Sequence, residues 1–351
     1  MSDPPRLIPV ARFPRLRGLA WAGDQLYAGC GYQLLSARIQ DPARVTWKPV
    51  ASFRPAWWRQ FTVGYRLAAR LVRDGFHTLS VLPSGGLVAA VPGAIVTLRP
   101  NETEFRRTHV ITRGTRPLHL TVVHSGAVFW GEYFDNSARE EVHIYGSTDG
   151  GESWSVAYTF PKGSIRHVHN IVHDPWDNCL WVLTGDYGNE CRILRAACDF
   201  SRIETVLQGN QQARAVALVP MEDGLYFASD TPLESNHIYR LDRAGPLTQL
   251  APISSSSIYG CRVGEHVFFS TMVEPSEVNR DRNVRVYGSR DGQSWQPLLA
   301  RKKDRWPIGL FQYGNAFLPD GDNATPYLAV TTIAVEADDM VMSLYSVQSP
   351  T

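Results

Sequence analysis

The sequence predicts an all-β protein, and within that class a β-propeller of seven four-stranded blades, with six blades as the alternative. Three observations support this prediction. The chain of 351 residues contains 28 Gly, 23 Pro and 11% aromatic residues, a composition typical of short strands joined by tight turns. Pairs of short apolar runs recur along the chain, and one turn motif occurs twice. A ring of like sheets is the architecture that such a repeat favours.

Each repeat unit contains an apolar run, a turn with Gly, Asp, Asn or Glu, and a second apolar run. Equivalent positions lie 42 residues apart from His77 to His119, then 50 to His169, 45 to Arg214 and 45 to Tyr259. Propeller blades repeat about every 40–50 residues. The first runs are residues 17–21, 77–82, 118–123, 169–173, 214–219, 259–263 and 309–314, and the second runs are residues 25–30, 86–91, 127–133, 179–186, 224–230, 266–272 and 326–332.

The two ends of the chain are expected to close the ring. Residues 6–13 form an apolar strand that we expect to pair with residues 342–347 in the last blade, which removes the exposed sheet edges. The longer gap after the first repeat contains residues 54–75, interpreted as an insertion with a short helix at residues 65–73. We therefore expect residues 1–351 to form a single propeller domain.

Composition excludes several classes of protein. The 35 basic and 34 acidic side chains give a net charge of +1, which does not indicate a nucleic-acid-binding protein. No apolar stretch reaches the roughly 18 residues of a membrane span, and the N-terminal residues lack a signal-peptide pattern, so a cytoplasmic protein is expected. The five cysteines include no CxxC pair, which favours reduced, buried thiols over a zinc site, with a Cys191–Cys198 disulfide as an alternative.

The repeated turn motif is S-T-D-G-G-E-S-W at residues 147–154 and S-R-D-G-Q-S-W at residues 289–295. The two copies begin 142 residues apart, which corresponds to about three blades. An aspartate at this place accepts hydrogen bonds from the backbone of the turn, and glycine provides positive φ. The tryptophan that follows is expected to fold back as an apolar plug. We therefore assign Asp149, Asp291, Trp154 and Trp295 a structural role.

The motif resembles the Asp box, or BNR repeat, of sialidase-like propeller glycoside hydrolases. This resemblance implies a propeller fold and an activity on carbohydrates. The first copy matches the full Asp-box pattern, and the second lacks one residue. The arginine triad and the Tyr–Glu pair of sialidases have no clear counterpart here, and FPRLRG at residues 13–18 differs from their early arginine motif. The predicted seven blades and the histidines at blade starts also resemble oligogalacturonate and ulvan lyases, without a linear motif.

Propeller geometry selects the candidate site residues. The start of each innermost strand and the end of the second strand share one rim of the ring, around a central funnel that is a favoured ligand position. Inner-strand starts provide Arg17, His77, His119, His167, His169, Arg214 and Tyr259, preceded by Arg166, Gln211 and Gln212; second-strand ends and the loops after them provide Glu132, Tyr133, Asn136, Asp186, Glu190, Asp230, Asn236 and Glu274.

Histidines at equivalent blade positions are the most specific feature of this set. His77, His119 and His169 occupy the same place in three repeats, and His167 points to the same face as His169 if the strand is regular. Imidazole at such a position serves as a general base, as a ligand of a divalent metal held by His77, His119 and His169, or as a donor to a sugar hydroxyl. The alternative is a set of hydrogen-bonded structural histidines.

The other candidates also have two interpretations each. Arg166 and Arg214 either clamp a carboxylate or cap loop carbonyls. Asp186 and Asp230 act as acids or bases, or they form Asx turns. Glu132 and Tyr133 are adjacent on a strand, so at most one of them faces a shared site.

Two functions follow from these residues. The main prediction is an enzyme that cleaves a glycosidic bond in an acidic oligosaccharide or polysaccharide. In an elimination, His119, His167 or His169 abstracts the proton, Arg214 or a metal stabilises the enolate, and Tyr259 or Tyr133 protonates the leaving oxygen. In a hydrolysis, two of Glu132, Asp186 and Asp230 form the carboxylate pair. The substrate-binding candidates are His77, Arg17, Arg166, Gln211, Gln212, Asn136, Glu190 and Asn236. The alternative is a non-catalytic propeller that binds a glycan or a protein.

Overall fold

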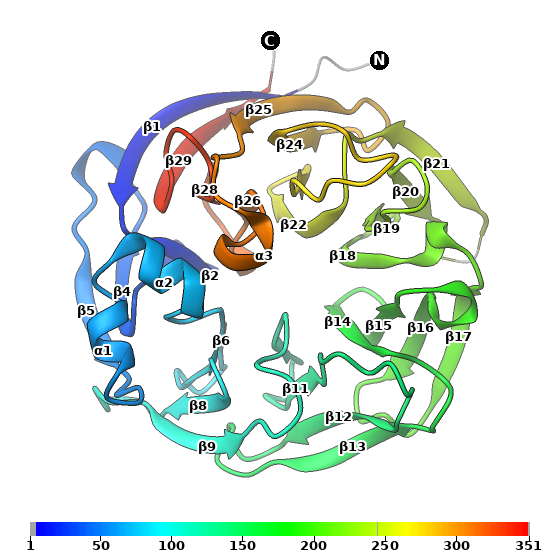
Figure 1. Cartoon of the computed structure of the whole chain (residues 1–351), viewed down its shortest axis with the longest axis horizontal. Coiled ribbons are helices and arrows are strands. Elements are labelled where there is room, and N and C mark those ends of the chain that lie inside the picture. The colour runs from blue at the N-terminus through cyan, green and yellow to red at the C-terminus, as the bar shows by residue number, and fades with distance from the viewer. Residues whose placement is uncertain (1–4, 244, 350–351) are drawn as a thin grey trace.

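Seven sheets, antiparallel except for one added parallel strand, stand around a central axis in the computed structural model, which describes residues 5–243 and 245–349 (Figure 1). The seven-bladed propeller predicted from the repeat is confirmed, and six blades are excluded. Among the described helices, the longest has seven residues, and none is long and apolar enough to cross a membrane.

In each of the first five blades, the four consecutive strands follow one another in chain order from the axis outward. Blade 1 contains β2 (Arg17–Gly23), β3 (Gln25–Cys30), β4 (Gln33–Arg38) and β5 (Lys48–Ser52), and blade 2 contains β6 (Thr78–Val81), β7 (Leu87–Val91), β8 (Ala94–Leu98) and β9 (Arg106–Val110). Blade 3 contains β10 (Thr121–Val122), β11 (Val128–Gly131), β12 (Val142–Ser147) and β13 (Ser155–Phe160), and blade 4 contains β14 (His167–Asp174), β15 (Cys179–Gly185), β16 (Arg192–Ala197) and β17 (Ile203–Gln208). Blade 5 contains β18 (Ala215–Met221), β19 (Gly224–Ser229), β20 (His237–Leu241) and β21 (Leu247–Pro252).

The last two blades complete the ring. Blade 6 contains β22 (Ser257–Val263), β23 (His266–Thr271), β24 (Asn283–Ser289) and β25 (Gln296–Lys302), and blade 7 contains β26 (Asn315–Phe317), β28 (Tyr327–Ile333), β29 (Val341–Gln348) and β1 (Arg6–Pro14). Short 3-10 helices lie at Pro42–Arg44, Gly188–Glu190 and Gln211–Ala213.

The N-terminal strand closes the ring as predicted. β1 pairs antiparallel with β29, from Arg6 opposite Gln348 to Pro14 opposite Val341. The first and last parts of the chain therefore share one sheet, and the outer edge of blade 7 carries strand β1 (Figure 1).

Blade 7 differs from the prediction at its inner strand. Residues 309–314 were expected to be a strand, but Ile308–Phe311 forms the short helix α3, and the inner strand β26 begins only at Asn315. After β26 the chain adds β27 (Asp320–Asn323) in parallel to β2, so blade 1 gains a fifth strand. Pro307 starts the helical turn and Gln312 leaves it at a positive φ of 72°, which explains why an apolar run here does not extend as a strand.

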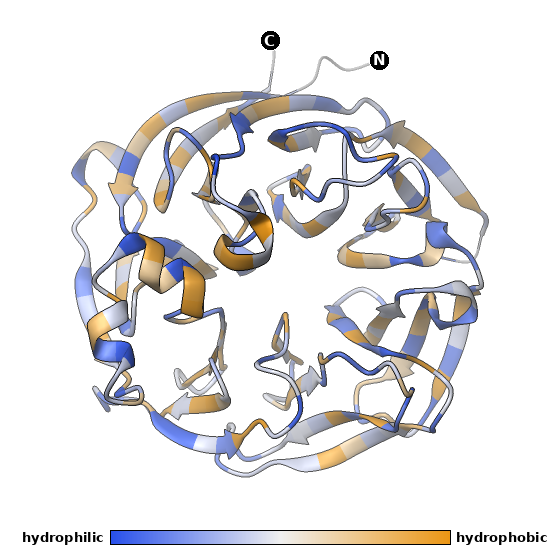
Figure 2. Ribbon diagram, in the orientation of Figure 1, coloured by the Kyte–Doolittle hydropathy of each residue, from blue (hydrophilic) through white to orange (hydrophobic). Residues whose placement is uncertain are grey.

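Hydrophobic contacts between blades hold the ring together. Seven clusters of buried apolar side chains are present among the described residues, and each joins two neighbouring blades. Phe268 of blade 6 and Phe227 of blade 5 are fully buried in two of them. Burial of one such side chain contributes roughly 1.5–3 kcal/mol. The outer strands show alternating hydrophilic and hydrophobic bands, because only one face of each contacts a neighbour (Figure 2).

The insertion after blade 1 runs from the outer edge of the ring toward the central axis (Figure 1). It carries α1 (Arg59–Thr62) and α2 (Arg66–Val72), and the helix expected over residues 65–73 is present as α2. Buried Arg70 of α2 donates to the carbonyl of Phe311 in α3, and Gln312 donates back to the carbonyl of Arg70. Helices α2 and α3 are therefore joined by hydrogen bonds on the side of the insertion that faces the central axis (Figure 1).

The Asp boxes occupy the turns between the third and fourth strands of blades 3 and 6, as expected for a structural motif. Asp149 accepts hydrogen bonds from the backbone N–H groups of Glu152 and Ser153 and from the hydroxyls of Ser147 and Ser153. Trp154 packs against the cluster between blades 2 and 3 and donates to Thr108 Oγ1 over 3.2 Å. The motif therefore stabilises an outer turn, far from the inner strands.

Candidate functional site

A cavity of about 270 Å³ lies at the axis of the ring, where the inner strands begin. Six of the residues predicted for the site line it, namely Tyr133, His169, Arg214, Asp230, Tyr259 and Glu274. The cavity has a basic side, from the insertion and the segment before blade 3, and an acidic side, from blades 5 and 6. Four inner strands have a β-bulge near their starts, at Leu19, His169, Val216 and Ile258. Bulges redirect side chains, which turns these strand starts toward the axis.

The basic side is formed by Arg73 and Arg116, with Arg17 nearby. Arg73 follows α2 in the left-handed conformation, with φ 55°. Arg116 makes no hydrogen bond or ion pair with any residue of the described ranges 5–243 and 245–349. Burial lowers the pKa of Arg116 to about 10, and repulsion from Arg73 and Arg17 acts in the same direction. An uncompensated guanidinium thus faces the cavity.

The guanidinium of Arg17, unlike that of Arg116, has contacts with neighbouring residues. Its guanidinium lies 3.8 Å from the centre of the Phe317 ring and donates to the carbonyl of His77 over 2.9 Å. The ring of His77 is fixed by a 2.8 Å bond from Nε2 to the carbonyl of Arg73. Burial, followed by the nearby Arg116, holds the pKa of His77 well below its usual value, so this imidazole is neutral. Arg17 and His77 line a second cavity of about 170 Å³ between the insertion and blades 7 and 1.

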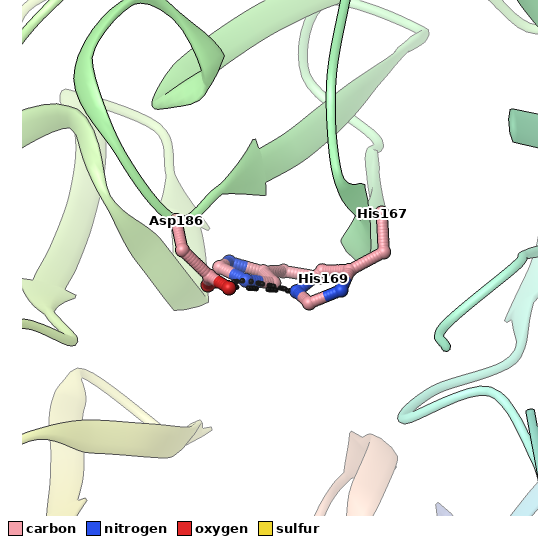
Figure 3. A group of neighbouring side chains, drawn as sticks. All are labelled: His167, His169 and Asp186. Carbon is pink, nitrogen blue, oxygen red and sulfur yellow. Dashed lines mark hydrogen bonds and ion pairs between the residues drawn. The ribbon is translucent and has the colours of Figure 1, made fainter. Parts of the chain in front are cut away.

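Two histidines and a carboxylate converge at the inner end of blade 4 (Figure 3). His167 and His169 begin β14, and Asp186 follows β15 on the neighbouring strand. The distance from His169 Nε2 to His167 Nε2 is 3.1 Å, and Asp186 Oδ1 lies 3.2 Å from the former and 3.5 Å from the latter. All three residues are buried, with exposed fractions of 3%, 5% and 8% for His169, His167 and Asp186.

Two arginines contact the same carboxylate. Arg214 Nη2 lies 3.3 Å from Asp186 Oδ1, and Arg166 Nη1 donates to Asp186 Oδ2 over 3.2 Å. Burial acts to raise the pKa of Asp186, yet the imidazoles and Arg214 outweigh it and hold that pKa well below its usual range. Asp186 is therefore ionised, and its carboxylate has a fixed orientation.

The acidic side contains Asp230 and Glu274. Arg214 Nη2 lies 3.5 Å from Asp230 Oδ2, and Ser256 donates to Glu274 Oε2 over 2.7 Å. Burial raises the pKa of both carboxyl groups, and the second cause for Glu274 is the charge of Asp230. Two carboxyls close together in a buried place favour a state in which one of them keeps its proton.

Two tyrosines complete the lining. Burial raises the pKa of Tyr133 to about 12 and also raises that of Tyr259, so both phenols keep their protons at neutral pH. The Tyr133 ring lies 4.3 Å from the His167 ring, and Tyr259 contacts His119 edge-on at 5.7 Å between ring centres. Each phenol can therefore donate a hydrogen bond to a ligand in the cavity.

Other predicted site residues form contacts that stabilise loops and strands and do not line the cavity. Glu132 binds Arg113 and accepts from the backbone N–H of His143, so Tyr133 is the member of this pair that faces the cavity. Asn136 accepts from the backbone N–H of Glu140 over 2.8 Å and fixes its own loop. Glu190 accepts from Arg139 over 2.5 Å in the same region.

The remaining predictions lie near Asp186 and Asp230. Gln211 donates to the backbone carbonyl of Asp186 over 3.0 Å and accepts from Thr231, so it positions this loop. Asn236 spans the loop after β19, accepting from the Thr231 N–H and donating to its carbonyl. Gln212 is exposed.

The three histidines predicted as metal ligands do not come together. His77 is bound to the Arg73 carbonyl, and His119 Nδ1 lies 3.2 Å from Asp320 Oδ2 in β27. Only His169 has another histidine at ligand distance, and that partner is His167 on its own strand. Equivalent repeat positions are separated around the ring, whereas positions two apart on one strand are neighbours, which is why the predicted set was wrong.

Sequence reasoning missed Arg73 and Arg116. Arg116 stands three residues before His119, just as Arg166 stands three residues before His169, so the repeat alignment contained a signal for it. Arg73 belongs to the insertion, which has no counterpart in other blades. Asp320, the partner of His119, also had no signal, because β27 is an extra strand.

Comparisons with known proteins identify the fold. No protein-family model matches the chain, and no curated protein is significantly similar to it in sequence. Among solved structures, it is similar to the WD40 β-propeller domain of Doa1, with a TM-score of 0.57 and 11% identity over 99% of this chain and 97% of that one. A chain of the mitotic checkpoint complex gives a TM-score of 0.57 and 10% identity over 99% and 96%. These similarities support the propeller fold, and they do not show the sialidase-like family.

Proposed function

We propose that this chain is a ligand-binding propeller that takes a short acidic saccharide into its central cavity. The observation that carries the proposal is Arg116, whose guanidinium lines the cavity beside Arg73 without an ion pair to any described residue. A carboxylate matches the paired donors of a guanidinium and would remove the repulsion between the two arginines.

The opposite side of the cavity favours a ligand rich in hydroxyl groups. Asp230 and Glu274 offer carboxyl groups, and Tyr133 and Tyr259 offer phenols that keep their protons. A sugar acid combines one carboxylate with several hydroxyls, so it complements both sides at once. The aromatic rings provide apolar surface for a sugar ring. The resemblance of the Asp boxes to sialidase-like propellers supports the same class of ligand.

The size of the cavity limits the ligand. A volume of about 270 Å³ lies slightly below the roughly 300–1,000 Å³ of typical small-molecule sites. It suits a short saccharide or the end of a longer chain. Propellers commonly act by binding, and one of the similar solved structures is an assembly, the mitotic checkpoint complex, which supports a binding role.

Cleavage of the bound saccharide is a second candidate, favoured by the raised pKa values of Asp230 and Glu274. A carboxyl with a raised pKa is better suited to general acid catalysis than an ordinary one. In an elimination, which requires His169 Nε2 to be free of any metal, His169 would take the proton next to the ligand carboxylate, the C–H electrons would form the C=C bond, and Tyr259 would protonate the departing glycosidic oxygen. Hydrolysis would instead use the two carboxyls with water.

Calorimetric titration with short oligogalacturonates tests the proposal. We expect binding by the wild-type protein and at least tenfold weaker binding of the neutral galactose oligomers of the same length. Arg116→Gln should lower the affinity by about 50-fold, since a charge-assisted bidentate contact contributes roughly 1.5–3 kcal/mol. Failure of the acidic and neutral sugars to differ would overturn the proposal.

A matched control is Arg107→Gln on the outer strand β9, where the arginine is exposed. This variant should bind like the wild type. Product analysis of the same mixtures decides the second candidate: ultraviolet absorbance of an unsaturated sugar indicates elimination, new reducing ends without absorbance indicate hydrolysis, and unchanged ligand indicates a binding protein.

A further inference from the structure

We propose that His167, His169 and Asp186 bind a divalent transition metal, of which Zn²⁺ is the best match. The inference does not depend on the identity of the saccharide. It rests on the hydrogen bonds of the two imidazoles, on the distances among three potential ligand atoms, and on the packing around His169.

The hydrogen bonds of the Nδ1 atoms determine the tautomers. His167 Nδ1 lies 3.1 Å from the carbonyl of Phe134, and His169 Nδ1 lies 3.0 Å from the carbonyl of Ala215. A carbonyl oxygen only accepts, so each Nδ1 carries the hydrogen. Neutral rings then present the lone pairs of both Nε2 atoms, and these face each other over 3.1 Å. Two facing lone pairs repel unless a cation or a proton lies between them.

The carboxylate of Asp186 adds a third lone pair to the same point. Its Oδ1 atom is 3.2 Å and 3.5 Å from the two Nε2 atoms (Figure 3). Zinc binds nitrogen and oxygen at about 2.0–2.2 Å, which places neighbouring ligands of a tetrahedral site roughly 3.3 Å apart. The three distances agree with that spacing. Two imidazoles with one carboxylate are a known ligand type for zinc and other transition metals, whereas Mg²⁺ and Ca²⁺ prefer oxygen.

The surroundings resemble the outer shell of a metal site. Metal-binding histidines usually donate their other N–H to a carbonyl or carboxylate, as both rings do here. Arg166 and Gln211 hold the loop of Asp186 in place. Gly185 lies so close that a Cβ there would approach His169 Cε1 to 2.5 Å, so glycine is needed for this ring position.

The second cluster of this kind, Asp174, Asp177 and Cys179, contains no imidazole. Asp174 accepts from Trp181 and Arg243, and Asp177 pairs with Arg243 and Arg195. Arginines also pair with Asp186, so the two clusters differ in the facing imidazoles and not in the charge around their carboxylates. The cluster is therefore a matched control of similar composition without the facing imidazoles.

Titration of chelator-treated protein with Zn²⁺ tests the proposal. We expect one Zn²⁺ bound per chain, and at least 100-fold weaker binding in His167→Gln and Asp186→Asn, while Asp177→Asn binds like the wild type. Wild-type protein without stoichiometric Zn²⁺, or equal affinity in Asp186→Asn, would overturn it.

Two measurements on the wild type keep the test informative if the variants unfold. Co²⁺ should give the visible absorption of a nitrogen-ligated tetrahedral site, and Zn²⁺ but not Mg²⁺ should raise the melting temperature. If instead a proton bridges the imidazoles, NMR will show an Nε2 proton that persists in the presence of Zn²⁺, and the proposal fails.

Discussion

The central cavity and the Asp-box turns are both rich in polar groups, but they differ in how those groups are satisfied. In the first Asp box, Asp149 accepts four hydrogen bonds within its own turn. In the cavity, Arg116 has no partner among the described residues, and the Nε2 atoms of His167 and His169 face each other. Polar groups that satisfy one another stabilise the fold, whereas groups left without partners at a concave place indicate a ligand.

The difference also shows why the most visible motif is not the site. An Asp box can be recognised in sequence because the hydrogen bonds that Asp149 accepts all come from within eight residues. The cavity brings together residues from the insertion and from blades 3 to 7, none of which forms a motif alone. Four substitutions test this contrast.

The largest expected effect on stability comes from Asp186→Asn. The substitution removes the buried charge between Arg214 and Arg166, and breaking such a network costs about 3 kcal/mol. Urea unfolding measures it. Asp135→Asn is the control, because Asp135 also pairs with Arg166 but its side chain is 79% exposed. Equal losses in the two variants would contradict the role given to Asp186.

Gly151→Ala should have the next largest effect, about 2 kcal/mol, through a strained φ and close contacts. Gly151 has φ 87°, and a Cβ would lie 2.7 Å from Val88 and 2.8 Å from Thr97. Gly150→Ala is the matched control, with φ 77° but only one contact, at 3.6 Å from Leu82. We expect it to lose less stability, and both variants to keep saccharide binding. Weaker binding in Gly151→Ala would mean that the Asp box influences the cavity.

Asp149→Ala should cost about 1 kcal/mol at pH 7, because the lost bonds lie in an exposed turn. Burial acts to raise the pKa of Asp149, but hydrogen bonds from Ser153 and Ser147 lower it from 3.8 to about 2. A lowered pKa contributes stability above pH 3.8 that is lost as pH falls through 2. Urea unfolding at a series of pH values should show the difference between variant and wild type shrinking in that range. A constant difference would exclude this cause.

The smallest effect, with the opposite pH dependence, is expected for Glu274→Gln. Burial and then Asp230 raise the pKa of Glu274, so its contribution to stability is present below its unfolded pKa and is lost as pH rises through the folded value. The neutral amide should therefore make the protein equally or slightly more stable at pH 7, by at most about 1 kcal/mol. Thermal unfolding at pH 4 and pH 7 measures the change, and a clear loss of stability at pH 7 would contradict it.

Local patterns predicted much of the fold. Apolar runs at regular spacing indicated seven blades, and the pairing of residues 6–13 with 342–347 followed from the need to cover sheet edges. The error in blade 7 has a local cause: residues 309–314 are apolar like a strand, yet they form α3 and a loop that contact the insertion. A short apolar run does not by itself distinguish a strand from a single turn of helix, and none of the α3 residues is buried.

The candidate site was predicted only in part. The repeat alignment selected His167, His169, Asp186, Arg214 and Asp230, and the structure brings these five into one network. Arg73 lay outside the alignment, because an insertion has no equivalent position. The tautomers of the two imidazoles depend on the carbonyls of Phe134 and Ala215, which belong to neighbouring blades.

The sequence by itself determined the class of fold, the closure of the ring and the structural role of the Asp boxes, because each depends on burial or on hydrogen bonds among nearby residues. The tertiary structure decided which rim residues share the cavity, which histidines meet and which guanidinium has no partner. Those outcomes depend on distances between blades and on β-bulges that turn single side chains. The spacing of hydrophobic residues along the chain gives no information about either.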